Sequence, residues 1–142
     1  MQVLIRRIDK ELPLPEYKTQ GAVAMDLSAR ETVTIAPHAI GIVFLNVSIK
    51  APEGHVILMA ARSSLHKRGL TMINGVGVFD EDFCGDEDEY RAILQNYTDE
   101  PVIVERGDRI VQIMIIPYVK VTLQEVSSLG NASRGGFGTT GI

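Results

Sequence analysis

Alternation of apolar and polar side chains with a period of two strongly restricts how this 142-residue chain can fold. In the run 42–49 every second residue is Val, Leu or Ile, which gives an extended backbone one apolar face. Similar runs, rich in β-branched residues and bounded by Gly, Pro, Asn or Asp, cover 91–95, 102–104, 110–116 and 119–126. Such runs are typical of short β-strands. The sequence therefore predicts an all-β fold, a jelly-roll or barrel-like sandwich, with at most one short helix at 63–68.

The composition is that of a globular domain, with 45% hydrophobic and 23% charged residues. The single cysteine, Cys84, excludes an internal disulfide framework and a multi-thiolate zinc site. The apolar runs are too short to span a membrane, and no leader peptide is evident, so we expect no membrane partner and a cytoplasmic location. We expect one β domain over residues 1–130 and a glycine-rich C-terminal lid over 131–142.

The formal net charge is −4, from 14 basic and 18 acidic residues, and a mildly acidic chain argues against nucleic-acid binding. The acidic residues are concentrated in one segment. Seven of them lie between positions 80 and 89, namely Asp80, Glu81, Asp82, Asp86, Glu87, Asp88 and Glu89. Such a patch either binds cations or keeps a surface hairpin solvated.

Two segments combine residue types suited to a nucleotide. Arg62, Ser63 and Ser64 open the short helical segment and could form a phosphate cradle, or simply an N-cap beside a surface arginine. The segment 74–80 joins Asn74 and two glycines to a carboxylate, Asp80. It could read a base edge and present Asp80 to a water, or it could be an ordinary glycine-containing hairpin.

Three further features carry polar groups in unusual places. Gln112 interrupts an apolar strand and must find a partner in the protein or a ligand. Asp26 is a lone carboxylate in a strand-like run, suited to a metal's water shell or to a surface cation. The C-terminal tail sets Arg134 and Phe137 among glycines, whose backbone N–H groups can converge on an anion. It is either a plain mobile terminus or a segment that folds over a phosphate ligand.

Taken in order, these segments resemble the five motifs of the trimeric dUTP diphosphatase (dUTPase) family. The motifs correspond to residues 23–27, 61–65, 74–85, 107–112 and 134–141. The resemblance covers nearly the whole chain. It implies an enzyme that hydrolyses dUTP to dUMP and pyrophosphate, with Mg²⁺ on the triphosphate and with sites shared between the subunits of a homotrimer.

The resemblance also implies a role for each matching residue. Asp80 is the general base, Phe83 packs beneath the deoxyribose, and Asp26 orders water around the Mg²⁺. Asn74 and the backbone at Gly77 read the uracil. The residues matching phosphate contacts are Arg62, Ser63, Ser64 and Gln112. In the lid, Phe137 stacks on the uracil, while the phosphates are reached by Arg134, Gly138, Thr139 and Thr140. Arg62, Arg134 and the metal are the positive charges expected near the triphosphate.

The sequence departs from the family pattern at several places. Phe83 replaces the usual tyrosine, Asp86–Asp88 reads as an insertion, and the segment between Arg134 and Phe137 is shortened. Two alternatives follow. One is a nucleotide-binding regulatory module of the same fold without turnover. The other is a relative of dCTP deaminase, which needs a glutamate where this chain has Ile93.

Overall fold

The computed structural model describes residues 1–136, which form eleven strands and one short 3-10 helix and confirm the all-β prediction. The strands are β1 (Leu4–Arg7), β2 (Met25–Ser28), β3 (Val33–Ile35), β4 (Ile40–Phe44), β5 (Val47–Lys50), β6 (His55–Ala61), β7 (Leu70–Met72), β8 (Val76–Phe79), β9 (Arg91–Asn96), β10 (Val102–Val104) and β11 (Arg109–Pro117), and the 3-10 helix is η1 (Leu65–Arg68). Within these residues, no helix has the length and apolar character needed to cross a membrane.

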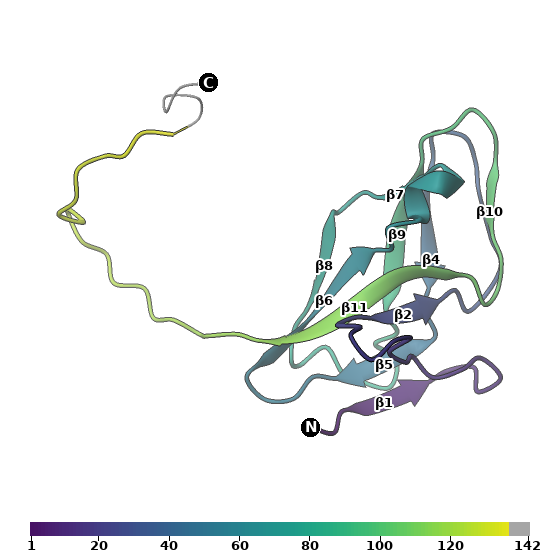
Figure 1. Ribbon diagram of the computed structural model, residues 1–142, viewed down its shortest axis with the longest axis horizontal. Helices are drawn as coiled ribbons and strands as arrows, with labels where there is room; N and C mark the ends of the chain where they lie inside the picture. Colours follow the sequence, from purple (N-terminus) through teal and green to yellow (C-terminus); the bar gives the residue numbers. More distant parts are fainter. Residues whose placement is uncertain (137–142) are drawn as a thin grey trace.

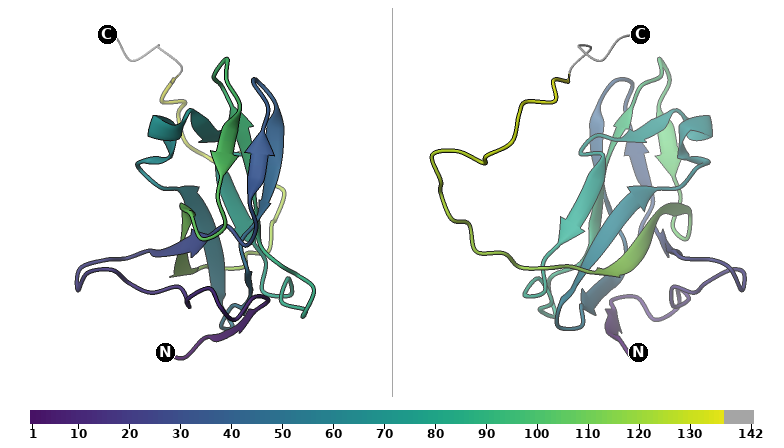
Figure 2. Two further views of the ribbon diagram at one scale, coloured as in Figure 1. Left: turned by 90° about the vertical axis from the view of Figure 1, so that its right-hand side faces the viewer. Right: turned by 60° about the vertical axis from the view of Figure 1, so that its left-hand side comes forward.

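The strands pair antiparallel into four small sheets. A four-stranded sheet has the order β2-β11-β6-β8, and a three-stranded sheet has the order β4-β9-β7. The pairs β1-β5 and β10-β3 form two further, two-stranded sheets. Figures 1 and 2 show them wrapped around one interior, the sandwich that the sequence predicts.

The core lies between the two larger sheets. Ile57 and Ile113 from the four-stranded sheet join Val43 and Leu94 from the three-stranded sheet in one cluster, and all four are fully buried. Burial of each such side chain contributes about 1.5–3 kcal/mol. The period of two in the sequence corresponds to one buried face most clearly on β9, where Ala92, Leu94 and Asn96 are buried and Arg91 and Ile93 are exposed.

The run 42–49 is interrupted where one continuous strand was expected. β4 ends at Phe44 and β5 begins at Val47, because Asn46 has a φ of 68°. Asparagine tolerates this left-handed conformation better than most residues. The buried Asn46 side chain accepts a hydrogen bond from the Asp9 N–H (2.6 Å) and donates one to the Asp9 carbonyl (2.9 Å). The chain thereby turns from the β4-β9-β7 sheet into the β1-β5 pair.

The chain leaves the sandwich after Pro117, and residues 118–136 form an extended arm (Figure 1). The prediction of a strand over 119–126 is wrong for the single chain, because no described segment pairs with the arm. The side chain of Leu123 is 90% exposed, and Val119 and Val121 are exposed as well. The arm starts well before position 131, where the tail was expected.

Candidate active site

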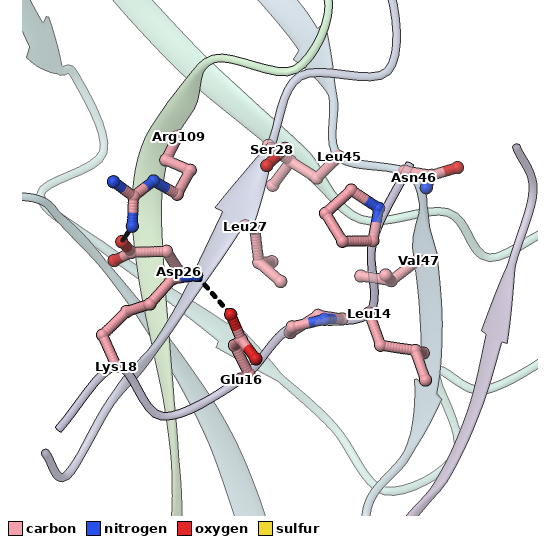
Figure 3. Close-up of a pocket in the computed structure, with 12 residues that line it drawn as sticks. Leu14, Glu16, Lys18, Asp26, Leu27, Ser28, Leu45, Asn46, Val47 and Arg109 are labelled. Atoms are coloured by element: carbon pink, nitrogen blue, oxygen red, sulfur yellow. Dashed lines mark hydrogen bonds and ion pairs between the residues drawn. The ribbon is translucent and has the colours of Figure 1, made fainter. Parts of the chain in front are cut away.

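Three charged side chains meet at one end of the four-stranded sheet. The Asp26 carboxylate lies 3.1 Å from Arg62 Nε and 3.1 Å from Arg109 Nη1, and its side chain is only 15% exposed. Arg62 also donates from Nη1 to the Arg109 carbonyl (2.9 Å). Figure 3 shows the Arg109 contact beside the hollow that Asp26 helps to line. We call Asp26, Arg62 and Arg109 the arginine cluster.

The strand register builds this cluster. An irregularity in β11 between Arg109 and Val111 sets Gln112 opposite Asp26 on β2 and opposite Ala60 on β6. The Gln112 amide donates to the Ala61 carbonyl (3.0 Å), so the polar residue on this strand finds its partner within the protein. The structure thus brings together Asp26, Arg62 and Gln112, which belong to the first, second and fourth of the expected motifs.

Ser63 and Ser64 precede the 3-10 helix, which begins at Leu65 rather than at position 63. Ser64 is the N-cap residue, and its side chain makes no capping hydrogen bond with the described residues. Both serines are exposed next to Arg62. Their hydroxyl groups are therefore accessible to a ligand at the arginine cluster.

The arginine cluster carries two guanidinium groups and one carboxylate, so it has an excess of positive charge suited to an anion. Arg109 was not expected here, since Arg62 and Arg134 were the only basic side chains predicted to lie near the triphosphate. Arg109 lies in the fourth motif, but its contact with Asp26 depends on the β2–β11 register. That register brings positions 26 and 109 together from opposite ends of the chain.

The other residues predicted to form the site lie along β8. Asn74 is exposed in the turn that precedes the strand, and Gly77 is buried within it. A Cβ atom at Gly77 would lie 3.1 Å from Met59 Cε and 3.3 Å from a ring atom of Phe79, so a side chain there would crowd its neighbours. Asp80 follows the last residue of the strand and lines a cleft of about 540 Å³.

The neighbouring acid, Glu81, is held by the protein. Its carboxylate accepts a hydrogen bond from the Gly54 N–H (2.6 Å) and lies 3.9 Å from Lys120 Nζ. The Tyr118 hydroxyl and the Gly54 N–H hold the pKa of Glu81 below its ordinary value. In contrast, the Asp80 carboxylate makes no hydrogen bond or ion pair with another described residue. Asp80 is thus the carboxylate of this pair that is available to a water molecule.

Residues 80–90, the Asp80 loop, contain Phe83 and the acidic segment Asp86–Asp88. The Phe83 ring is 39% exposed, and its N–H donates to the Asp80 carbonyl (3.2 Å). A local hydrogen bond tightens this segment, since the Gly85 N–H donates to the Asp88 carboxylate (2.7 Å). Arg6 on β1 donates to the Asp86 carbonyl (2.7 Å) and so ties the loop to the N-terminal strand.

Glu89 anchors the far end of the Asp80 loop. It is 8% exposed, and its carboxylate accepts from Arg30 Nε (2.8 Å) and from the Asn46 N–H (2.9 Å). Breaking a fully buried pair costs about 3–5 kcal/mol. The Arg30 side chain is 27% exposed, so part of that cost is screened by solvent.

We expect Glu89→Gln to lower the free energy of unfolding by about 2 kcal/mol, because Arg30 loses its counter-charge. Urea unfolding at one protein concentration measures this change. The control is Glu87→Gln in the same loop, at an exposed position, which should leave the midpoint unchanged. Equal midpoints for the two variants would contradict the assignment of Glu89 as an anchor.

The arginine cluster and Asp80 lie at opposite ends of the four-stranded sheet. On β6, Ile57 pairs with Phe79 and Ala60 pairs with Val76, so Asp80 lies level with residue 56. Six residues at about 3.3 Å each separate that level from Arg62, a distance of roughly 20 Å. Arg134 lies on the arm, and the predicted lid residues Phe137, Gly138, Thr139 and Thr140 lie outside the described residues.

Comparison with known proteins identifies the family. The family model for dUTPase matches residues 10–141. The chain belongs to the dUTPase family. The similarity to related proteins extends over the full length of both chains. It is 38% identical over 146 residues to a deoxyuridine 5'-triphosphate nucleotidohydrolase of Hydrogenobaculum, with 100% of this chain and 99% of that protein covered.

Solved dUTPase structures share this fold. The crystal structure of dUTPase from Streptococcus mutans superimposes with a TM-score of 0.76 at 32% identity, over 83% of this chain and 98% of that one. The dUTPase of Staphylococcus bacteriophage 80alpha, solved with dUPNHPP, has a TM-score of 0.86 over 99% of each chain. At 21% identity, the phage protein supports the fold alone.

Proposed function

We propose that this dUTPase-family chain hydrolyses dUTP to dUMP and pyrophosphate, with Asp80 as the general base. The observation that carries the proposal is the accessible Asp80 carboxylate in its cleft, at the end of the strand that begins after Asn74. A nucleoside lying along β8 would have its uracil at Asn74 and the backbone of Gly77, and its deoxyribose at Phe83. The α-phosphate would then be next to Asp80.

The reaction is a displacement at the α-phosphorus. A water oxygen forms a bond to phosphorus while the bond to the oxygen bridging to the β-phosphate breaks, and pyrophosphate leaves. Asp80 accepts the proton of the attacking water. Arg62, Ser63, Ser64 and Gln112 donate to the phosphate oxygens, and Arg109 adds a second guanidinium to that set. The chain's contribution is therefore positioning and charge stabilisation.

The Asp26 carboxylate suits a Mg²⁺ ion that is bound mainly by the phosphates of the substrate. Within residues 1–136, no three His, Cys, Asp or Glu side chains are grouped to hold a metal. Mg²⁺ usually keeps several waters and is held by substrate phosphates with one or two carboxylates. A carboxylate has about four acceptor positions, so Asp26 can accept from the water shell while it contacts both arginines. When bound, Mg²⁺ would neutralise charge on the phosphates.

We expect Asp26→Asn to raise the Mg²⁺ concentration for half-maximal activity about tenfold, because a residue that orders the outer shell of a metal is replaced by a neutral one. Titration of Mg²⁺ at saturating dUTP measures the effect. The matched control is Glu16→Gln, since Glu16 lines the same hollow and pairs with Lys18 (Figure 3). An unchanged Mg²⁺ requirement in Asp26→Asn would remove this residue from the metal site.

A complete site requires more than one copy of the chain, and a homotrimer with shared sites fits this need. Arg62 lies level with the Asn74 end of β8, whereas the phosphates would lie at the Asp80 end. The arginine cluster that meets them would therefore belong to another subunit. The exposed apolar side chains of the arm also need a cover, which a second copy can supply. The arm would carry the lid to a neighbouring subunit, with Phe137 on the uracil and with the phosphates contacted by Arg134, Gly138, Thr139 and Thr140.

Pyrophosphate release from dUTP, dTTP, dCTP and UTP tests the proposed activity. We expect dUTP to be preferred over dTTP by roughly a hundredfold, since a tight slot at Gly77 would exclude the 5-methyl group. Equal rates with all four nucleotides would refute the proposal.

Ammonia release from dCTP would point to a deaminase, although Ile93 on β9 cannot shuttle protons. Tight binding of dUTP without hydrolysis in saturating Mg²⁺ would indicate a regulatory module.

A further inference from the structure

Three aromatic rings, Phe79, Phe83 and Tyr90, pack against one another at the Asp80 loop. Phe79 ends β8, Phe83 lies within the loop, and Tyr90 closes it. The ring centroids of Phe79 and Tyr90 are 3.8 Å apart with an interplanar angle of 9°. Phe83 lies 6.0 Å from Phe79 and 6.1 Å from Tyr90, so its ring contacts both members of the stacked pair.

These contacts are what orients the Phe83 ring. A phenylalanine has no hydroxyl group, so only ring contacts and its backbone can fix its position. Its backbone is held through one turn hydrogen bond to Asp80, in the loop that contains the acidic segment Asp86–Asp88. Tyr90 is fully buried and donates from its hydroxyl to the Ile49 carbonyl (3.3 Å). The stacked pair is thus a fixed support beneath a partly exposed ring.

We propose that Phe79 and Tyr90 are positioning residues for sugar selection, because they hold the Phe83 ring where it leaves no room for a 2′-hydroxyl group. This inference rests on the proposed function, in which Phe83 packs beneath the deoxyribose. The pair acts through Phe83, whose ring packs against both of its members. Weakening the pair therefore lowers the preference for dUTP over UTP without altering the preference for dUTP over dTTP.

The experiment compares kcat/KM for dUTP, UTP and dTTP in the full-length chain. Phe79→Leu should lower the dUTP:UTP ratio about tenfold, which corresponds to the loss of one aromatic contact, and leave the dUTP:dTTP ratio within about twofold. Phe44→Leu is the matched control, since it makes the same change at a ring that packs against Arg30 and Arg91 rather than against Phe83, and it should retain the parental dUTP:UTP ratio. If Phe79→Leu does not fold, Phe79→Met offers a longer and more adaptable side chain that can fill the place of the ring, and it carries the same expectation.

A double-mutant comparison separates positioning from general loosening. Phe83→Ala should lower the dUTP:UTP ratio, and adding Phe79→Leu to it should lower the ratio no further, because both changes remove one function. An unchanged dUTP:UTP ratio in Phe79→Leu, equal losses in both ratios, or additive effects in the double variant would overturn the inference. Parental protein that does not prefer dUTP over the other nucleotides would instead refute the proposed function.

Discussion

Asp80→Asn lowers kcat by roughly a thousandfold if Asp80 is the general base, because an amide cannot accept the proton of the attacking water. The substitution is nearly isosteric, and the Asp80 carboxylate makes no hydrogen bond or ion pair with other described residues that the change would break. Folding and nucleotide binding should therefore be retained. Steady-state pyrophosphate release at saturating dUTP and Mg²⁺ measures the loss.

Asp86→Asn provides the matched control for this loss. It removes one negative charge from the same loop, and the Asp86 side chain is exposed and points to Arg6 through a long contact of 3.9 Å. Its kcat should stay close to that of the parental chain. Near-parental turnover in Asp80→Asn, or an equal loss in both variants, would exclude Asp80 from the role of base.

Removal of residues 133–142 should lower activity on the order of a hundredfold, because a segment that closes over the substrate fixes its reacting geometry and excludes water. The truncation takes away the glycine-rich segment with Arg134 and Phe137 and leaves the sandwich and most of the arm. Assembly should be unchanged. Pyrophosphate release measures activity, and light scattering measures the mass of the assembly.

A chain that lacks only Ile142 is the control for this truncation, since it keeps the whole of the fifth motif. It should have parental activity and parental mass. If the longer truncation fails to assemble, the segment is structural rather than a lid. If it retains full activity in the normal assembly, the lid assignment is wrong.

The fold follows from the sequence where one face of a strand is buried. β9 (Arg91–Asn96) covers the run predicted at 91–95, and Ile110, Val111 and Ile113 from the run 110–116 join the core through β11. Pattern alone does not show where the chain bends, so the left-handed turn at Asn46 divides a run that looks continuous. Nor does it show whether a strand has a partner, and the run 119–126 has none within the described chain.

The sequence identifies individual residues of the candidate site, but it does not show how they are arranged in space. The motifs identify Asp80 and Arg62, but their separation of roughly 20 Å follows from the register of β6 and β8. The contact of Arg109 with Asp26 depends on the irregularity in β11, which no local pattern reveals. The aromatic pair beneath Phe83 joins Tyr90, at the end of the Asp80 loop, to Phe79 at the end of β8, a contact that no local pattern reveals.

The most direct test of the shared site is a crystal structure of the full-length chain with a non-hydrolysable dUTP analogue and Mg²⁺. We expect the Asp80 carboxylate to lie one bridging water away from the α-phosphate. We also expect Arg62 of a different subunit to contact the same triphosphate. An Asp80 carboxylate separated from that phosphate by more than one water molecule would contradict the account.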